Sequence, residues 1–224
     1  MDRFSSYQSP FSWRYGSQEM RRVWSEENKR LLWRQLWVAL AETQVEWELV
    51  TKEQAADLRA HAVDIDIPLA LEVEEKLRHD LMAEIKVFAG QCPVGGGIIH
   101  LGATSMDIKD NAEALQIKEG LCIVVQRLSA LLHVLAGLME EHAALPVMAF
   151  THLQPAEPTT LGYRLTNTGQ DLLADWKALN DLKQTLKGKG FKGAVGNAAS
   201  YVMLMGEADF ELFEKLMSDR LALP

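Results

Sequence analysis

The chain has 224 residues, of which 48% are hydrophobic and 24% charged, and its formal net charge is −8 at pH 7. This composition is ordinary for a soluble globular protein, and the negative charge argues against a general surface for nucleic acid or for an anionic membrane. A small anionic substrate remains compatible with it, provided that a few cations gather in a pocket.

The N-terminus and the cysteines give expectations about location. The first residues lack the apolar core of a secretory signal, and no apolar run is expected to reach the ~18 residues of a membrane span. The two cysteines, Cys92 and Cys122, show no Cys/His spacing for zinc. We therefore expect a cytoplasmic protein with no disulfide framework, no metal site and no membrane segment.

The first two helices are marked by their starting residues. Ser25 is followed by two glutamates and then by apolar residues at helical spacing, which predicts a helix with one buried face. Four of the six tryptophans lie between Trp24 and Trp47, and we expect them to pack in the core. Thr51 and Gln54 have the capping-box spacing that opens a second, short helix.

The next segment is expected to form one continuous helix that begins at Asp66 and Pro68. Its apolar positions recur at helical spacing as far as Phe88, and the Gly-rich run of residues 90–97 then ends it as a loop. On such a helix His79 falls opposite the apolar stripe, so this histidine should lie on the polar face.

Two long helices dominate the second half of the chain. One is expected from about Asp107 to His142 and the other from Thr160 to Leu186; a Gly-rich loop at residues 188–200 and a short helix from Glu207 to Asp219 follow. Helices of this length suggest a bundle in which they run side by side. No convincing strand pattern occurs, so the predicted fold class is all-α.

We expect two domains. An N-terminal helical domain would cover residues 1–104, and the first part of a long central helical bundle would cover residues 105–224. Two long helices leave apolar faces uncovered, so we expect the bundle to be truncated, with further residues or other subunits covering these faces.

Two candidate sites precede the long helices. Arg14 and Tyr15 are adjacent, and such a pair can hold a phosphate through charge and hydroxyl donation, with an ordinary surface pair as the alternative. Arg78, His79 and Asp80 form the second cluster. A histidine that faces a cleft and is oriented by a neighbour suits proton transfer, whereas a solvated histidine on a polar face has no such role.

A third candidate is the start of the first long helix, in the motif HLGATSMDIKDN that begins at His100. Thr104 and Asp107 have the capping-box spacing. Free backbone N–H groups, together with the hydroxyls of Thr104 and Ser105, can also hold a carboxylate, because a helix N-terminus favours anions. The structural and the functional interpretation are compatible.

The remaining candidates lie in turns. Thr151 and His152 precede the second long helix in the run THLQP, where the histidine is either a buried, satisfied side chain or a general acid or base. In the Gly-rich loop, Lys189 and Lys192 could approach a phosphate. The loop matches no P-loop or dinucleotide motif, so a hinge is the preferred interpretation.

The motifs, taken in order, resemble those of one family. The segments SWRYGSQEM, RHDLMAEIKVFA, IIHLGATSMDIKDN, THLQPAEPTTLGYR and FKGAVGNAAS are similar to successive motifs of the adenylosuccinate lyases, within the fumarase/aspartase superfamily. The resemblance covers nearly the whole chain. The pairing of RY with RHD and GATS separates it from argininosuccinate lyases and fumarases.

This resemblance implies an all-α fold and a homotetramer whose active sites collect residues from three subunits. It implies a small anionic nucleotide substrate and a β-elimination, in which loss of a proton beside a carboxylate and cleavage of a C–N bond release fumarate. The other product would be AMP or the aminoimidazole carboxamide ribotide. No metal or organic cofactor is implied, because preorganised hydrogen-bond donors stabilise the developing charge.

Roles for the first two clusters follow from the same resemblance. Arg14 and Tyr15 would bind the nucleotide end of the substrate. Arg78, His79 and Asp80 would line the same pocket. Within this cluster His79 would lie close to the reacting centre.

Roles for the later residues follow in the same way. Thr104 and Ser105 would hold a carboxylate of the succinyl group. His152, beside Thr151, matches the family's general acid, which protonates the departing nitrogen.

One departure from the family pattern concerns the base. The family's base is a serine in a loop with a sequence motif similar to SSxMPxKxN, and this motif does not occur in the chain. An acid without a base should give little turnover. A catalytically inactive, lyase-derived structural or interaction subunit is therefore the alternative, and a lyase for a related succinyl-amine is a third possibility.

Overall fold

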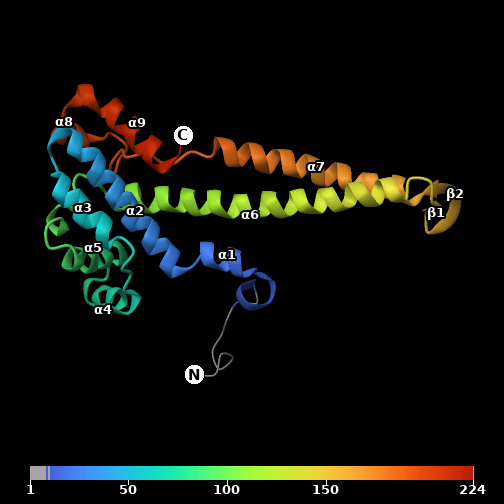
Figure 1. Cartoon of the computed structure of the whole chain (residues 1–224), viewed down its shortest axis with the longest axis horizontal. Helices are drawn as coiled ribbons and strands as arrows, with labels where there is room; N and C mark the ends of the chain where they lie inside the picture. The colour runs from blue at the N-terminus through green and yellow to red at the C-terminus, as the bar shows by residue number, and fades with distance from the viewer. Residues whose placement is uncertain (1–8, 10, 224) are drawn as a thin grey trace. The chain divides into compact units, whose positions relative to one another are not determined.

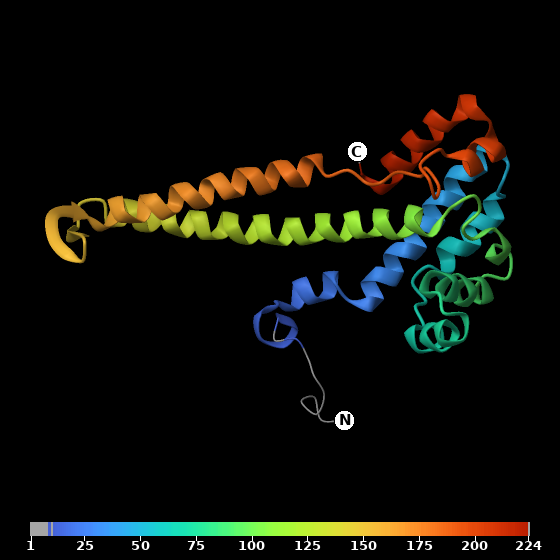
Figure 2. The same ribbon diagram turned by 180° about the vertical axis from the view of Figure 1, so that it is seen from behind.

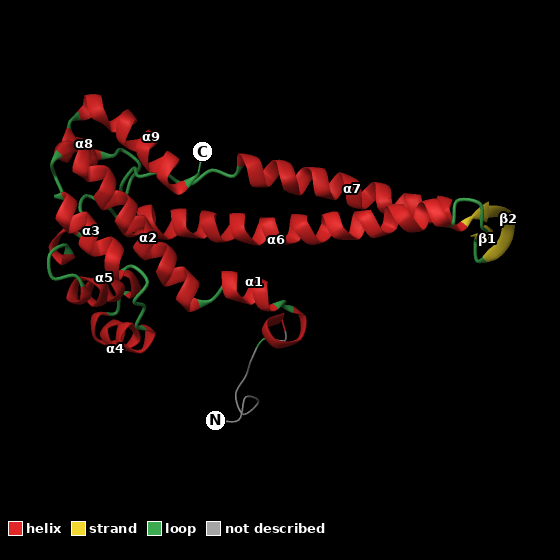
Figure 3. Ribbon diagram, viewed as in Figure 1, coloured by secondary structure: helices red, strands yellow, loops and turns green. Residues whose placement is uncertain are grey.

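The computed structural model describes residue 9 and residues 11–223. Most of these residues are helical, and their strands form one two-stranded hairpin, which confirms the predicted all-α class (Figures 1 and 3). The chain divides into two compact units, one of residues 1–117 with 186–224 and one of residues 118–185. The domain boundary expected after residue 104 stays a prediction.

The first compact unit contains the short helices. In chain order they are α1 (Gln18–Val23), α2 (Glu26–Gln44), α3 (Lys52–His61), α4 (Ile67–Leu77), α5 (Asp80–Gln91), the first part of α6 (Ser105–Glu141), α8 (Ala199–Met205) and α9 (Phe210–Leu221), with short turns η1 (Phe11–Tyr15), η2 (Val45–Trp47), η3 (Gly96–Ile98) and η4 (Glu207–Asp209). Helix α8 was not predicted and begins inside the expected Gly-rich loop. Both ribbon views show α3 and α9 beside α2 (Figures 1 and 2).

The predicted helix starts are confirmed by their hydrogen bonds. Ser25 Oγ accepts the N–H three residues later at 3.1 Å. Thr51 and Gln54 form both halves of the capping box, at 3.2 and 3.0 Å. Asp66 caps α4 by accepting an N–H at 3.0 Å. Each cap satisfies a donor that the helix leaves without an internal partner, which stabilises it by about 1 kcal/mol.

The continuous helix predicted between residues 66 and 88 is wrong. Arg78 has a φ of 56°, in the left-handed region, and ends α4. His79 then has extended backbone, and its Nδ1 accepts the N–H of Met82 at 3.3 Å. His79 is therefore the N-cap of α5 and not a side chain on a polar helix face. The apolar repeat hid the break because it continues from one helix into the next.

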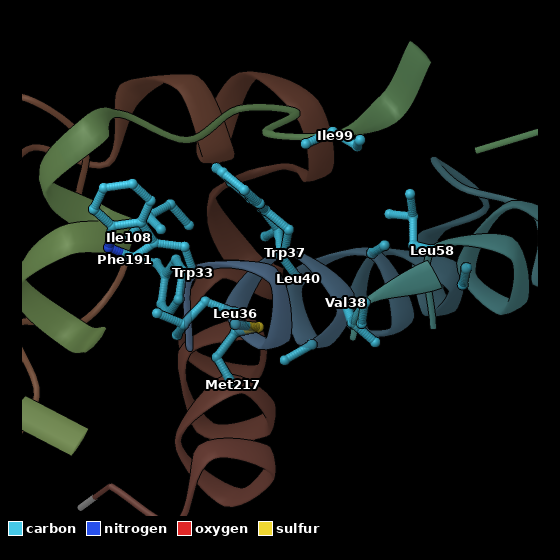
Figure 4. Packing of buried hydrophobic residues seen from close by; sticks show 14 of the residues in the cluster. Trp33, Leu36, Trp37, Val38, Leu40, Leu58, Ile99, Ile108, Phe191 and Met217 are labelled. Carbon is cyan, nitrogen blue, oxygen red and sulfur yellow. The ribbon is translucent and has the colours of Figure 1, made fainter. Parts of the chain in front are cut away.

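The core of this unit lies around α2. Figure 4 shows Trp33 and Trp37 packed among apolar side chains from α3, α6, α9 and the Gly-rich loop. Both rings are buried, as predicted, and Trp47 is partly buried against the same cluster. Trp24 is 51% exposed, so the prediction fails for this residue. Full burial of one large apolar side chain stabilises the fold by about 1.5–3 kcal/mol.

A buried ion-pair cluster joins α2 to α5. Arg30 Nη1 and Arg34 Nε donate to the two carboxylate oxygens of Glu84 at 2.8 and 2.7 Å. All three side chains are almost completely buried. Arg34 also donates to Gln91 Oε1 at 2.8 Å, so the cluster holds α5 near its middle and at its last residue. Its members depend on one another, because a buried charge that loses its partner is strongly destabilising.

The second compact unit is a helical hairpin with a strand pair at its tip. It contains residues 118–141 of α6, strand β1 (Pro146–Thr151), strand β2 (Gln154–Thr160) and α7 (Leu161–Thr185). Figures 1 and 2 both show α7 beside this part of α6. Gly162 permits the close approach, since a Cβ there would lie 2.6 Å from the carbonyl oxygen of Met139.

The strand pair contradicts the expectation that the chain contains no strand. The turn expected at His152 is present, but β2 separates it from α7. The two strands are antiparallel, from Pro146 opposite Thr160 to Thr151 opposite Gln154. Three prolines and an almost fully exposed β2 hid the strand pair, because proline is depleted in strands and no buried face imposes alternation.

The second unit has an apolar surface. An 18-residue window of α6 has a mean hydropathy of 1.9, and 6% of it is buried. By length and composition alone this helix could cross a membrane, which corrects the expectation that no run is apolar enough. The large apolar side chains of this unit with at least 43% exposure are Leu131, Val134, Leu145, Met148, Phe150, Leu153, Tyr163, Leu173 and Leu182.

Candidate active site

The start of α5 is tied to the first turns of α6. Lys109 Nζ donates to Asp80 Oδ1 at 2.7 Å, and the N–H of Leu81 donates to the same oxygen at 2.7 Å. Partial burial, the largest single influence, raises the pKa of Asp80. The hydrogen bonds from Lys109 and Leu81 and the charges of Lys109 and His79 together outweigh it, so this pKa lies below its usual value. Asp80 is therefore held ionised beside His79.

His100 lies near this cluster and was given no role on the sequence alone. Its backbone has a φ of 70°, and its Nδ1 accepts the indole N–H of Trp37 at 3.0 Å. Burial lowers the pKa of His100, a nearby charge on Asp107 opposes this effect, and His79 adds to it. The neutral ring therefore carries its proton on Nε2, where it can donate. The motif HLGATS, which this histidine opens, is the signal that could have found it.

The start of α6 offers donors for an anion. The N–H of Thr104 donates to Asp107 Oδ2 at 3.0 Å, which confirms one half of the predicted capping box. Among the described residues, the N–H groups of Ser105 and Met106 donate to no other part of the chain. These two N–H groups and the hydroxyls of Thr104 and Ser105 lie at the positively polarised N-terminus of a long helix, where they can bind an anion.

In the Gly-rich loop, Lys189 is not free to bind a phosphate. The ammonium of Lys189 donates to Asp107 Oδ1 at 2.7 Å, and the N–H of Gly193 donates to the same oxygen at 3.2 Å. Lys192 lies 3.7 Å from a carboxylate oxygen of Glu214. Lys189 and Gly193 of this loop therefore bind the carboxylate of Asp107.

A pocket of about 350 Å³ lies between this loop and α9. Asn111, Phe191 and Met217 are among its lining residues. Lys189 and Lys192, the candidate lysines of this loop, also line it, whereas His79, Thr104 and Ser105 do not.

The first predicted pair lies in the π-helical turn η1. The guanidinium of Arg14 lies 4.8 Å from the ring centroid of Trp13, and Tyr15 is 69% exposed. Within the described residues, no hydrogen bond or ion pair joins this pair to the start of α6. Arg78 is exposed at the end of α4. The structure thus brings His79 and Asp80 to the helix start but leaves these three residues at the surface.

Thr151 and His152 belong to the second compact unit. Thr151 pairs with Gln154 at the end of the strand pair, and His152 and Leu153 form the two-residue turn, with φ values of 50° and 63°. His152 is exposed and Leu153 is 94% exposed. The interpretation of His152 as a buried, satisfied side chain is therefore wrong for this chain, while its role as a general acid stays a prediction.

Solved structures identify the class of fold. A 3-carboxy-cis,cis-muconate lactonizing enzyme from Pseudomonas putida superposes with a TM-score of 0.84 at 24% identity, over 95% of this chain and 48% of that one. A fumarate lyase from Mesorhizobium sp. BNC1 superposes with a TM-score of 0.82 at 24% identity, over 97% and 50%. At this identity the likeness shows the fold alone: the helical fold of these enzymes.

A family model described as Lyase matches residues 7–218, and the chain belongs to this lyase family. Within the family it is similar to the adenylosuccinate lyases of Schistosoma mansoni and Saccharomyces cerevisiae, at 43% and 38% identity over 91% of the chain. The enzyme of Pyrococcus abyssi is 37% identical over 96%. These relatives confirm the resemblance seen in the motifs. The chain spans 43–47% of their length.

Proposed function

We propose that the protein is an adenylosuccinate lyase, which eliminates fumarate from adenylosuccinate and from the succinylated aminoimidazole carboxamide ribotide. The named relatives support this assignment. The observation that locates the proposed active site is the cluster of polar residues at the start of α6. Lys109 ties Asp80, the neighbour of His79, to the first turns of α6. His100 lies in the turn that precedes Thr104 and Ser105, and this arrangement supports the proposal.

The donors at the start of α6 suit the substrate's succinyl carboxylate. In the elimination, a base removes a proton from the carbon beside a carboxylate, and negative charge develops on that carboxylate. The hydroxyls of Thr104 and Ser105 and the N–H groups of Ser105 and Met106 would stabilise this charge. Because these donors are fixed by the helix, they need little rearrangement as the charge forms.

The remaining groups would act on the rest of the substrate. His152 would protonate the departing nitrogen as the C–N bond breaks, and an exposed side chain is open to such a role. Arg14, Tyr15 and Arg78 would bind the nucleotide end, for which exposed cationic and hydroxyl groups are suited. These roles require no metal or organic cofactor.

We further propose a homotetramer with active sites shared between subunits, located in the cytoplasm. The apolar surface of the second compact unit supports this assembly, since such surfaces mark interfaces. A membrane is the weaker explanation for the apolar part of α6. Three exposed aspartates on the adjacent α7, namely Asp171, Asp175 and Asp181, would be costly in lipid.

The test is turnover by the protein expressed from its complete gene. Ultraviolet absorbance is followed with adenylosuccinate as the substrate, and fumarate is quantified separately. Release of fumarate supports the proposal, and His152→Ala should abolish most of the turnover while leaving the circular dichroism spectrum unchanged. A complete, tetrameric protein that releases no fumarate favours the inactive structural subunit.

A further inference from the structure

One carboxylate beside the start of α6 is completely buried. Asp107 has no exposed surface, and burying a charge is costly unless hydrogen bonds replace the lost water. Oδ2 accepts the N–H of Thr104 at 3.0 Å and the hydroxyl of Tyr201 at 3.2 Å. Oδ1 accepts the ammonium of Lys189 at 2.7 Å and the N–H of Gly193 at 3.2 Å.

These four donors come from three separate segments: the turn before α6, the Gly-rich loop and α8. Two further contacts connect the same segments. Asn111 receives the N–H of Gly190 at 3.2 Å and donates to its carbonyl oxygen at 3.0 Å. The hydroxyl of Ser200 donates to the carbonyl oxygen of Gly102 at 2.6 Å. The turn before α6 is thus held from several directions, with Asp107 at the centre.

The charge balance at this point also matters for anion binding. An unpaired acid in the first turn stabilises a helix but repels an external anion at the same N-terminus. The ion pair with Lys189 cancels the charge of Asp107. The N–H groups of Ser105 and Met106 are therefore available to an anion without a neighbouring uncompensated carboxylate.

We propose that Asp107 is a positioning residue, which fixes the turn at Thr104 and Ser105 against the Gly-rich loop in the geometry that binds a substrate carboxylate. This inference rests on the proposed function. Asp107 does not touch the substrate and acts through the N–H of Thr104.

Asp107→Asn gives a test in which two explanations predict opposite signs. The substitution removes a negative charge and leaves Lys189 uncompensated, so electrostatics alone predicts tighter anion binding. Its amide also places N–H donors against groups that already donate, which should displace the turn at Thr104. If Asp107 positions this turn, anion binding weakens despite the gain in positive charge.

Fumarate is the probe, titrated into the protein expressed from its complete gene because the proposed site is shared between subunits, while the amide NMR signals of Ser105 and Met106 are followed. We expect Asp107→Asn to weaken fumarate binding by about tenfold or more. Asp110→Asn, three residues further along α6, is the matched control for charge and should leave binding unchanged or tighter. Tyr201→Phe removes one of the four donors and should weaken binding by about two- to fivefold.

Amide hydrogen exchange gives a second measurement that needs no ligand. Exchange at Thr104 and Gly193 should accelerate about tenfold or more in Asp107→Asn, relative to amides in α2, and should be unchanged in Asp110→Asn. If Asp107→Asn does not fold, Tyr201→Phe is measured in the same way and should show a smaller acceleration.

The outcomes separate the two proposals. Unchanged exchange at Thr104, or fumarate binding that is equal or tighter in Asp107→Asn, overturns the positioning role. If wild-type Ser105 and Met106 do not respond to fumarate, the proposed carboxylate site fails. The exchange rates then still decide whether Asp107 holds the turn.

Discussion

The two compact units of this chain differ in how many of their apolar and charged side chains they bury. The first buries large apolar groups around α2 and pairs its buried charges within itself. The second, residues 118–185, buries only Gly120, Val125, Gly162 and Gly169. The first unit therefore has a core of its own, whereas the second has apolar surface enough for a partner. Substitutions should affect folding in the first unit and association in the second.

Trp37→Ala should produce the largest loss of folding stability, because it opens a cavity in the core and removes the hydrogen bond to His100. We expect a loss of about 3–5 kcal/mol in the free energy of unfolding, measured by urea denaturation. Leu131→Ala, in the second unit, is the control and should change this free energy by less than about 1 kcal/mol. Equal losses in the two variants would contradict the contrast between the units.

Glu84→Gln should be nearly as damaging, since it leaves Arg30 and Arg34 buried without their counter-charge. A loss of about 3 kcal/mol is expected by the same denaturation measurement. The matched control is Glu72→Gln, which breaks an exposed ion pair with Lys76 and should change the free energy of unfolding far less than Glu84→Gln does. A small effect of Glu84→Gln would mean that the cluster contributes little.

Val134→Lys probes the second unit, where this valine is 59% exposed. A charge on the apolar surface should weaken self-association by about tenfold or more, with little change in the unfolding of the first unit. Analytical ultracentrifugation over a concentration series measures the effect. Gln126→Lys, at an exposed polar position of the same helix, adds the same charge and should have little effect. Identical behaviour of both variants would count against an interface at Val134.

Thr51→Ala removes one half of the capping box at the start of α3. The expected loss is about 1 kcal/mol, because one helix N–H loses its acceptor. Thr168→Ala, at an exposed position in α7, is the control, and thermal denaturation compares the two. A larger loss in Thr168→Ala would be unexpected.

The smallest effect is a pH dependence that arises from His100. Its pKa is lowered in the folded protein, so the unfolded chain binds a proton at a higher pH than the folded chain does. This contribution to stability is fully present above the unfolded pKa of about 6.5 and is lost as the pH falls toward the folded pKa. His100→Gln should therefore flatten the stability profile just below neutral pH, as measured by urea titrations. An unchanged slope would refute the role of this histidine.

Local chemistry made part of the fold predictable from the sequence. Ser25, Thr51 and Asp66 mark helix starts correctly because capping depends on residues three positions apart. The break at Arg78 was missed because a non-glycine residue in the left-handed region leaves no sequence signal. The strand pair was missed because its prolines contradict strand propensity.

For the candidate site, the sequence located the helix start at Thr104 and Ser105, where one half of the capping box is present. It placed His79 on a helix face, whereas this residue is the N-cap of α5. The functional roles of these residues stay predictions. The partners of Asp107 could not be deduced, because Lys189 and Tyr201 lie 82 and 94 positions away in the sequence. Packing brings such residues together, and no local spacing records it.

The turn at His152 and Leu153 has a consequence for how this chain tolerates mutation. Two adjacent left-handed residues are the geometry that Asn-Gly adopts most readily, and a bulky side chain there costs about 1–2 kcal/mol. For stability alone, Asn-Gly would be the better pair at these two positions. Under the proposed role of His152, this strain is the cost of placing its side chain at the tip of the hairpin. A consensus-based stabilisation programme should therefore leave this turn unaltered.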